Sequence, residues 1–337
     1  MTRERKPATI TDIAKAANVS PSTVSRVLTG SAPVAAEKRA AVEAAIQALH
    51  FRPNLHARNL VRGESTTIGV VVSSATSPYY ADVLGGLLEA LDGSHYHIML
   101  AASHWYYQRN TYIQKIELVA RQSAGLVVIG GTEHEAALLA INTYTPIVCV
   151  GRKLHGLEHV CFLTTNQQGA YEATKHLIEL GHRRIALLSG MPWHPEMIER
   201  RTGYEQALRE AGLPIDESLI AEGNFSEQSG QICMEWLMQQ RIIPDAVFAA
   251  NDQMAYGAHL ALYRAELRVP NDVSLVGFDN LANSAYHIPP LTTVSQHLRE
   301  RGYAAGRALL QILNDEHPQA EVIPTSLIIR QSTTQRS

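Results

Sequence analysis

From Thr66 onward, short runs rich in β-branched residues alternate with amphipathic helical stretches, and this alternation constrains the fold more than any other feature. Strands that alternate with helices form parallel sheets covered by helices on both faces. Two successive sets of strands are visible, which predicts two α/β subdomains. The strands expected are Ile68 to Val72, Ile98 to Ala101, Leu126 to Ile129, Ile147 to Val150, Ile185 to Leu188, Ala246 to Ala249 and Val273 to Phe278.

Length and composition indicate a large folded chain. The 337 residues are 45% hydrophobic and only 18% charged, which is enough to bury a substantial core. No apolar segment follows the basic first residues, and no stretch approaches the roughly 18 uninterrupted apolar residues of a membrane span. We therefore expect a cytoplasmic protein with no membrane partner.

Metal binding and catalysis find no support in the sequence. The three cysteines, Cys149, Cys161 and Cys233, lack the close pairing of a zinc site, so we expect reduced thiols. His95 and His97 have no cysteine or carboxylate at ligand spacing. The nucleophile elbow G-x-S-x-G, the phosphate loop G-x-x-x-x-G-K-[ST] and the zinc motif H-E-x-x-H are all absent. We expect no enzyme activity and no cofactor.

Charge is distributed unevenly along the chain. Residues 1–63 carry ten Lys and Arg against four Asp and Glu, a formal charge of +6, so the remainder carries −9 of the total of −3. A basic head on an acidic body suggests that only the head approaches a polyanion.

The head has the pattern of two short helices joined by a turn. Thr9 and Asp12 resemble a capping box, and apolar residues then recur at helical spacing until Asn18, which tolerates a left-handed turn. Ser20 is placed to cap a second helix that has Pro21 at its first position. The inward-facing residues of this second helix are expected to be Val24, Val27 and Leu28.

This pattern predicts a helix-turn-helix, whose second helix enters the major groove of DNA. An arginine there can donate two hydrogen bonds to guanine, while hydroxyls near the helix start suit phosphate oxygens. The spacing alone also fits an ordinary amphipathic helical hairpin. The residues placed at base edges are Pro21, Ser22 and Arg26, and those placed at phosphates are Ser20, Thr23 and Ser25.

The segment "ATITDIAKAANVSPSTVSRVLTG" followed by "FRPNLHARNLVRGES" resembles the headpiece of the lactose-repressor (LacI/GalR) family. The resemblance implies a third helix from Ala36 to Leu49, and a hinge helix whose Leu60 enters the minor groove and bends the DNA. The alternative is a short linker helix whose leucine packs on its own domain. Thr29 and Ala35 stand where the family often has asparagine and a serine cap. The resemblance implies packing by Val42, Ala45, Ile46 and Leu49, and DNA contacts by Thr9, Thr29, Asn54 and Ala57.

Polar side chains follow several predicted strands, where parallel sheets collect ligands. Asn251 and Asp252 follow "VFAA", Asp279 follows "SLVGF", Arg152 follows "IVCVG", and residues 73–80 follow "IGVVV". Planar donors and acceptors combined with aromatic faces suit a hydroxyl-rich sugar. Alternatively, Asn251 and Asp252 only cap the helix from 253 to 264, and Asp279 only holds a turn.

The segments "ANDQMAYGA", "SLVGFDN", "YHIPPLTTVSQ", "HLIELGHRRIALLSG" and "ERRTGYEQAL" are also similar to the family, so the resemblance covers nearly the whole chain. It implies a polar clamp on effector hydroxyls and an aromatic platform. Gly151 and Thr165 replace aspartates of many relatives, so the effector need not be a galactoside. The implied residues are Asp279, Asn251 and Arg200 for the clamp, Phe225 for the platform, Tyr79, Tyr80 and Gln296 for further lining, and Trp105 and Trp193 as additional candidates.

The sequence therefore predicts a small all-α helix-turn-helix headpiece plus an α/β periplasmic-binding-protein-like core of two doubly wound parallel-sheet subdomains. The resemblance implies a switch between the subdomains near Thr164 to Asn166 and return crossings near Gln296 and Thr325. No leucine-heptad tail follows the expected last strand, Leu327 to Arg330, so a homodimer is expected rather than a tail-zippered tetramer. The expected divisions are a headpiece at 1–52, a hinge at 53–63, and a core at 64–337 with an N-subdomain (about 64–164 and 297–325) and a C-subdomain (about 165–296 and 326–337).

We expect a transcriptional repressor that binds a near-palindromic operator and responds to a small sugar through movement of the two subdomains. Co-repression, in which the ligand strengthens operator binding, uses the same cleft and stays open. A solute-binding protein of a transporter would share the hinged body but would need an export signal and no basic head. An α/β enzyme would need a nucleophile or cofactor loop.

Overall fold

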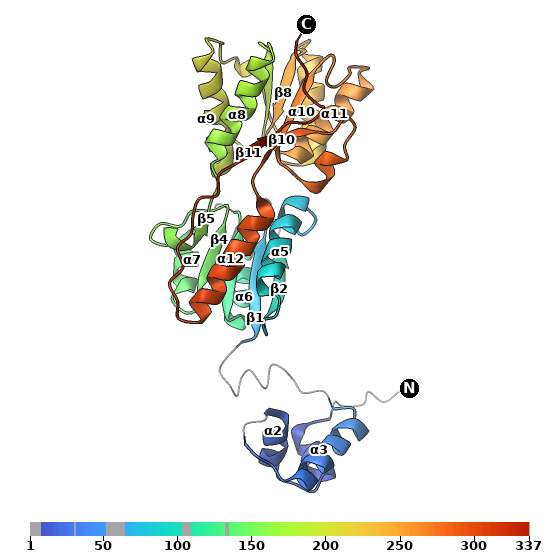
Figure 1. Ribbon diagram of the computed structural model, residues 1–337, viewed down its shortest axis with the longest axis vertical. Coiled ribbons are helices and arrows are strands. Elements are labelled where there is room, and N and C mark those ends of the chain that lie inside the picture. Colours follow the sequence, from blue (N-terminus) through green and yellow to red (C-terminus); the bar gives the residue numbers. More distant parts are fainter. Residues whose placement is uncertain (1–7, 30–31, 52–64, 103–108, 132–134, 337) are drawn as a thin grey trace. The chain divides into compact units, whose positions relative to one another are not determined.

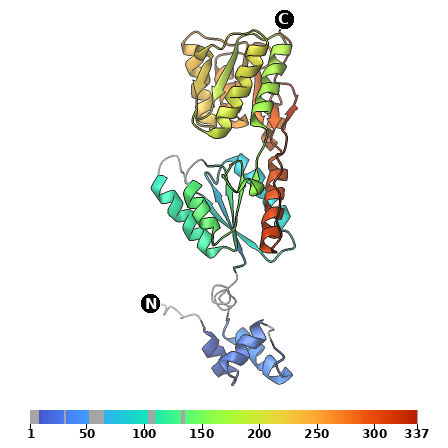
Figure 2. The same ribbon diagram turned by 90° about the vertical axis from the view of Figure 1, so that its left-hand side faces the viewer.

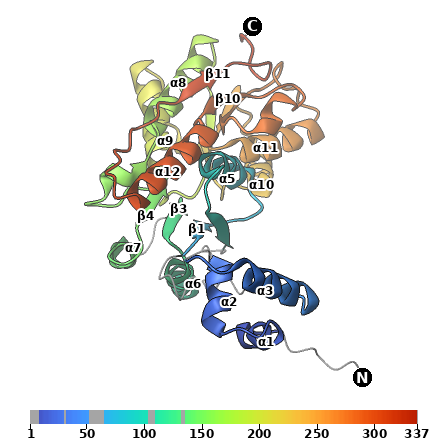
Figure 3. The ribbon, with the colours of Figure 1, turned by 60° about the horizontal axis from the view of Figure 1, so that its bottom comes forward.

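The computed structural model describes residues 8–29, 32–51, 65–102, 109–131 and 135–336, and the chain divides into one compact unit up to Ser65 and a second from Thr66. The first unit contains three helices, labelled in Figure 3: α1 (Ile10–Ala16), α2 (Pro21–Thr29) and α3 (Ala36–Ala48). Their contact surface is a small apolar core, which holds the helices together. It consists of Ile13, Ala14, Val24, Val42 and Ala45.

The ends of these helices follow local chemistry. Asn18 has φ of +51°, the left-handed turn residue expected between α1 and α2. Ala35, at the N-cap of α3, makes no side-chain capping hydrogen bond. The expected inward packing of Leu49 is wrong: it follows the last residue of α3 and its side chain is 40% exposed, because the helix ends before it. Phe51 packs against the core instead.

The second unit is built on two sheets (Figure 1). The first sheet is entirely parallel, with strand order β2-β1-β3-β4-β5. Its short last strand was not expected, because two residues are too few to give a pattern. The strands are β1 (Thr67–Val72), β2 (His97–Ala102), β3 (Gly125–Ile129), β4 (Ile147–Val150) and β5 (Cys161–Phe162).

The second sheet has the order β11-β10-β9-β8-β6-β7 and is parallel except for the antiparallel pairing of β10 with β11. The strands β7 and β10 were not among those expected. The last strand begins and ends earlier than the expected Leu327 to Arg330. The strands are β6 (Ile185–Ser189), β7 (Ile220–Glu222), β8 (Ala246–Ala249), β9 (Ser274–Asp279), β10 (Thr292–Ser295) and β11 (Ser326–Ile328).

Helices cover both faces of each sheet (Figures 1 and 2), as doubly wound folds require. In the N-subdomain, α5 and α12 contribute to one apolar cluster and α6 and α7 to another. In the C-subdomain, α8 packs on α9 and α10 packs on α11. The helices are α5 (Pro78–Leu91), α6 (Arg109–Gln122), α7 (Glu135–Asn142), α8 (Asn166–Glu179), α9 (Pro195–Glu210), α10 (Glu227–Gln239), α11 (Asp252–Arg264) and α12 (Leu298–Leu313).

The chain passes between the two sheets three times. It leaves β5 for α8 through residues 163–165, returns from β10 to α12 through Gln296 and His297, and reaches β11 after Thr325. Thr164 donates a hydrogen bond to the carbonyl of Ile323 over 2.7 Å, so two of the crossings are bonded to each other. Three connections allow the subdomains to move relative to each other while they stay tethered.

Helix α12 belongs to the N-subdomain because it packs very closely on α5 (Figure 3). A Cβ on Gly302 would lie 1.9 Å from the carbonyl oxygen of Val83, and a Cβ on Gly86 would lie 1.8 Å from that of Arg299. Only glycine permits this approach at both positions. The second crossing therefore enters a firmly held helix.

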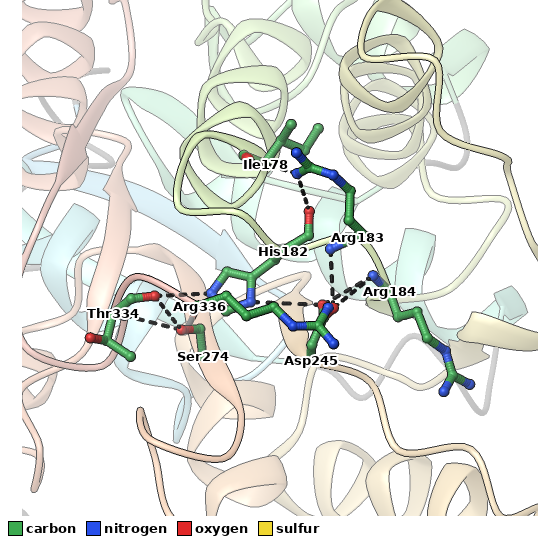
Figure 4. A network of polar contacts seen from close by, with 8 residues as sticks. All are labelled: Ile178, His182, Arg183, Arg184, Asp245, Ser274, Thr334 and Arg336. Carbon is green, nitrogen blue, oxygen red and sulfur yellow. Dashed lines mark hydrogen bonds and ion pairs between the residues drawn. The ribbon is translucent and has the colours of Figure 1, made fainter.

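A polar network at one end of the second sheet holds the C-terminal segment (Figure 4). Asp245, just before β8, accepts the backbone N–H groups of Arg183 and Arg184 and forms an ion pair with Arg336. The His182 ring lies 3.1 Å from the carbonyl oxygen of Thr334. Arg184 and Asp245 directly precede β6 and β8, so the network lies at the amino end of the sheet. None of the described helices is long and apolar enough to cross a membrane.

Candidate functional site

The first candidate surface is the N-terminal end of α2. The side-chain oxygen of Ser20 accepts the backbone N–H of Thr23 over 3.2 Å and lies 2.8 Å from the hydroxyl of Ser22. Pro21 is the first helical residue, as expected. Free N–H groups and hydroxyls at a helix start favour a phosphate oxygen.

One turn later, α2 presents its cation. Arg26 is exposed and stands four residues after the exposed Ser22, so both lie on one face of the helix, while Val24 is fully buried on the opposite side. Ser25 and Thr23 are half-buried. The exposed face of α2 thus combines hydroxyls with a guanidinium.

Thr9 has a structural role in α1. Its backbone N–H donates to Asp12 over 2.9 Å, and Asp12 N–H donates back to the Thr9 hydroxyl over 3.3 Å, which completes the expected capping box. The same hydrogen bonds lower the pKa of Asp12. Only the backbone of Thr29 is described, and Asn54, Ala57 and Leu60 lie outside the described residues.

The second candidate site is a cavity of about 400 Å³ between the two subdomains. In each sheet the first strand along the chain is a switch point, because the two strands that follow it lie on opposite sides of it. Strand β1 lies between β2 and β3, and strand β6 lies between β7 and β8. Such switch points collect ligands beyond the carboxyl ends of their strands. The lining residues follow those ends: Ser74, Thr76, Ser77, Pro78, Tyr79, Tyr80, His194, Glu196, Arg200, Asn224, Phe225, Ser226, Glu227, Asn251, Gln253 and Asp279.

Asp279 ends β9 with φ of +114°, a conformation that L-residues rarely adopt, and its side chain is buried. Gln296 donates a hydrogen bond to its carboxylate. Burial raises the pKa of Asp279 well above its usual range, and the nearby Arg200 guanidinium only partly opposes this. The cavity therefore has a carboxyl group that is poorly solvated and able to take part in hydrogen bonds with a ligand.

Arg200, on α9, is held from several sides. Its Nε donates to Asn166 over 3.0 Å and its Nη1 donates to the carbonyl of Ala250 over 2.6 Å. The guanidinium carbon lies 4.0 Å from the ring centroid of Phe278. This packing fixes the orientation of the guanidinium at the cavity wall.

Phe225 provides an aromatic wall from the loop after β7. A Cβ at Gly190 would lie 2.2 Å from its ring, so glycine is required there for the ring to occupy this place. The His194 ring is 5.5 Å away, centroid to centroid, at an interplanar angle of 73°. Such an edge-to-face arrangement leaves ring surface available for the C–H groups of a ligand.

Asn251 connects the cavity to α11 and to the Phe225 loop. Its side-chain oxygen accepts the N–H of Met254 over 3.0 Å, which caps α11, and its amide donates to the carbonyl of Phe225 over 3.0 Å. Asn251 therefore caps the helix and lines the cavity at the same time. Asp252 does not line it, because Ser284, Thr293 and the backbone of Leu281 enclose its carboxylate.

Comparison with known proteins decides the family. Residues 9–54 match the model of bacterial regulatory proteins of the lacI family, and residues 174–333 match a periplasmic binding protein-like domain. The HTH-type transcriptional repressor PurR of Pasteurella multocida is 34% identical over 338 residues, with 98% of this chain and 99% of the repressor covered. The chain belongs to the lacI family.

Two solved structures extend the similarity to the fold. The lac repressor dimer bound to operator and the anti-inducer ONPF gives a TM-score of 0.79 at 28% identity, with 98% of this chain and 100% of the repressor covered. The complex of the transcriptional regulator CelR with cellobiose gives 0.71 at 31% identity, with 96% and 99% covered. This lacI-family member is thus a DNA-binding transcriptional regulator, not an enzyme, and its partners are operator DNA and a small-molecule effector.

The cavity of this lacI-family regulator contains six of the nine effector residues expected from the sequence: Tyr79, Tyr80, Arg200, Phe225, Asn251 and Asp279. Arg152 is buried but does not line the cavity, and Gln296 is buried behind Asp279. Trp105 lies outside the described residues. Trp193 is 47% exposed and does not line the cavity either, whereas the neighbouring His194 does.

Sequence reasoning missed several lining residues of this regulator. Glu196 and His194 follow β6, and Asn224, Ser226 and Glu227 follow β7. Their position after strands was the available signal, but β7 has only three residues and was not predicted. Gln253 was assigned to a helix only, yet it accepts a hydrogen bond from Ser77 of the other subdomain over 2.9 Å.

Proposed function

We propose that the regulator is a repressor that binds its operator as a homodimer and changes its operator affinity when a sugar occupies the cavity between its subdomains. Buried Asp279 and Arg200 beside the Phe225 ring carry this proposal. A carboxyl and a guanidinium can bind neighbouring hydroxyls of one sugar, and an aromatic face suits its C–H surface. The cellobiose complex of CelR is consistent with this class of ligand.

The DNA-binding role assigns residues 1–52 to the headpiece, 53–63 to the hinge and 64–337 to the core. In a two-fold dimer, two copies of α2 meet two half-sites of an approximate palindrome. Ser22 and Arg26 face base edges, while Ser20 and Thr23 face phosphates. The solved lac repressor dimer bound to operator supports this arrangement.

Effector binding acts through a two-state equilibrium of the core. A sugar that prefers one arrangement of the subdomains shifts the population toward it, and the dimer transmits the change to the headpieces. A coupling free energy of roughly 1 to 3 kcal/mol changes operator affinity about 5- to 150-fold. A co-repressor differs only in which arrangement it prefers.

The test is operator binding by fluorescence anisotropy at fixed salt, with DNA from upstream of the regulator's own gene and a panel of sugars and purine bases. Release of a tight complex by one sugar is the expected result. Binding that appears only with a sugar would establish co-repression. A response confined to purine bases would overturn the sugar assignment, and the absence of sequence-specific binding would overturn the operator assignment for that DNA.

A further inference from the structure

The charged side chains that line the cavity are unbalanced. Among the described lining residues, three carry carboxyl groups, namely Glu196, Glu227 and Asp279, and one carries a permanent positive charge, Arg200. His194 adds little positive charge at neutral pH, because burial lowers its pKa below the usual range. Burial also raises the pKa of Asp279. Even with that carboxyl left out, two glutamates face one guanidinium, so a ligand that enters this cavity meets more negative than positive charge.

The single guanidinium is largely committed to the protein. Two of its nitrogens donate to Asn166 and to the carbonyl of Ala250, and its face packs on Phe278. The remaining nitrogen, Nη2, lies 3.7 Å from the carboxylate of Glu196. A phosphate or carboxylate group usually takes two parallel hydrogen bonds from an arginine. Arg200 cannot offer that fork without losing its present partners.

Glu196 is the carboxylate best placed to choose between ligands. It is the second residue of α9, where the positive end of the helix favours a negative charge. Its Oε1 is buried and has no hydrogen-bond partner in the protein. In contrast, Gln253 donates to Glu227 over 2.8 Å, and Gln296 donates to Asp279. Glu196 thus has an acceptor that no protein group satisfies.

Glu196 also reaches across to the other subdomain. A Cβ at Gly151 would lie 3.2 Å from Glu196 Oε1, 3.0 Å from the hydroxyl of Tyr79 and 3.2 Å from Nη2 of Arg301. The Tyr79 hydroxyl is likewise buried without a hydrogen-bond partner. Its pKa is raised, first by burial and then by the charge of Glu196. The small residue at 151 therefore leaves room for a carboxylate from α9, a hydroxyl from α5 and a guanidinium from α12.

We propose that Glu196 is the residue that restricts the effector to compounds without an anionic group, because its unsatisfied oxygen accepts a hydrogen bond from a ligand hydroxyl or ammonium and repels phosphate and carboxylate. The proposal rests on the proposed function, since it concerns the same cavity. The expected effector is a neutral sugar or an amino sugar, and not a sugar phosphate or a sugar acid. The proposal assigns the discrimination between anionic and other ligands to the side chain of Glu196.

The first experiment measures binding of matched compounds to the full-length regulator by isothermal titration calorimetry. The panel contains ribose, glucose and cellobiose, the monosaccharide phosphates, glucosamine, glucuronate, and purine bases with their nucleotides. We expect the tightest ligand to be uncharged or cationic and its phosphorylated or oxidised counterpart to bind at least tenfold more weakly. An anionic compound as the tightest ligand would overturn the proposal. A purine base as the tightest ligand would overturn the sugar class but support the charge selection.

The second experiment compares Glu196→Gln with Glu210→Gln, which removes the same charge from the exposed far end of the same helix. Glu196→Gln should reduce the affinity ratio between neutral and anionic members of a pair at least fivefold, whereas Glu210→Gln should leave the ratio as in the unmodified chain. Equal ratios in both variants would overturn the role of Glu196. Absence of binding by every compound would overturn both the charge selection and the sugar assignment.

Discussion

The amide of Gln296 donates a hydrogen bond to the carboxylate of Asp279, although the two residues belong to different structural parts of the cleft. Asp279 ends β9 at the cavity, whereas Gln296 lies in the crossing that leads into α12. The Gln296 oxygen in turn accepts from Arg301 of α12 over 2.8 Å. A ligand that engages Asp279 therefore acts on a residue linked to the firmly packed helix of the other subdomain.

Replacing Gln296 with alanine should weaken this link and destabilise the fold. The change leaves a buried carboxyl and a buried guanidinium without one partner each, which typically costs about 1 to 3 kcal/mol or more for charged groups. Urea denaturation should show the lower free energy of unfolding, and effector titration should show a smaller change in operator affinity. Gln168→Ala, at an exposed site on α8, is the matched control. Equal stability and effector response in the two variants would contradict a role for Gln296 in linking Asp279 to α12.

Asp279→Ala tests the cavity itself. The variant removes a buried acceptor from the core while it leaves the headpiece unchanged, so operator binding should persist and the response to effector should be lost. Anisotropy with and without effector measures both properties in one titration. Far-UV circular dichroism with a thermal scan distinguishes loss of response from loss of folding. A normal effector response by a folded variant would show that Asp279 does not contact the ligand.

We expect the protein to lose stability in mild acid because of a pair of partly buried histidines. His259 and His287 lie with ring centroids 4.7 Å apart, and burial lowers the pKa of His259 to about 4. In the unfolded chain, His259 binds a proton below about pH 6.5. In the folded chain, it binds that proton only below about pH 4. The contribution to stability is therefore complete above pH 6.5 and is lost as the pH falls from 6.5 toward 4.

The measurement is the free energy of unfolding by urea at several pH values between 7.5 and 4.5. His259→Asn should lose stability less steeply than the unmodified chain as the pH falls, whereas His317→Asn, at an exposed position, should follow the unmodified chain. Burial raises the pKa of Asp252 to about 6, so protonation of Asp252 favours the folded chain as the pH falls and opposes the histidine effect. The test is therefore the difference between the variants in the slope of unfolding free energy against pH. Parallel curves for all three proteins would refute the histidine contribution.

The architecture could be predicted from the sequence because its signal is repeated. Runs such as Ile147 to Val150 are buried on both faces and therefore consist wholly of apolar residues. The strand β7 shows the limit: it has three residues and ends in the exposed Glu222, so it has no pattern of its own. Its recognition depends on pairing with β6, which is information held in the fold.

The site was only partly predictable for a related reason. Arg152 and Tyr79 both follow strands, yet only Tyr79 lines the cavity. Strand order is not readable from local sequence. Glu196 was missed because a glutamate in the first turn of a helix is ordinary, and its unusual feature is an unsatisfied oxygen that only the packed structure reveals.

Arg26→Ala should separate base reading from charge attraction in the headpiece. Loss of a bidentate contact with guanine costs about 1 to 3 kcal/mol of discrimination at that base pair, and other positions of the operator should be unaffected. Competition anisotropy at fixed salt, with operators substituted one base pair at a time, locates the loss. Lys15→Ala removes one positive charge from an exposed position on α1 and should weaken binding to all sequences alike. An unchanged sequence preference in the Arg26 variant would mean that Arg26 contacts only phosphate.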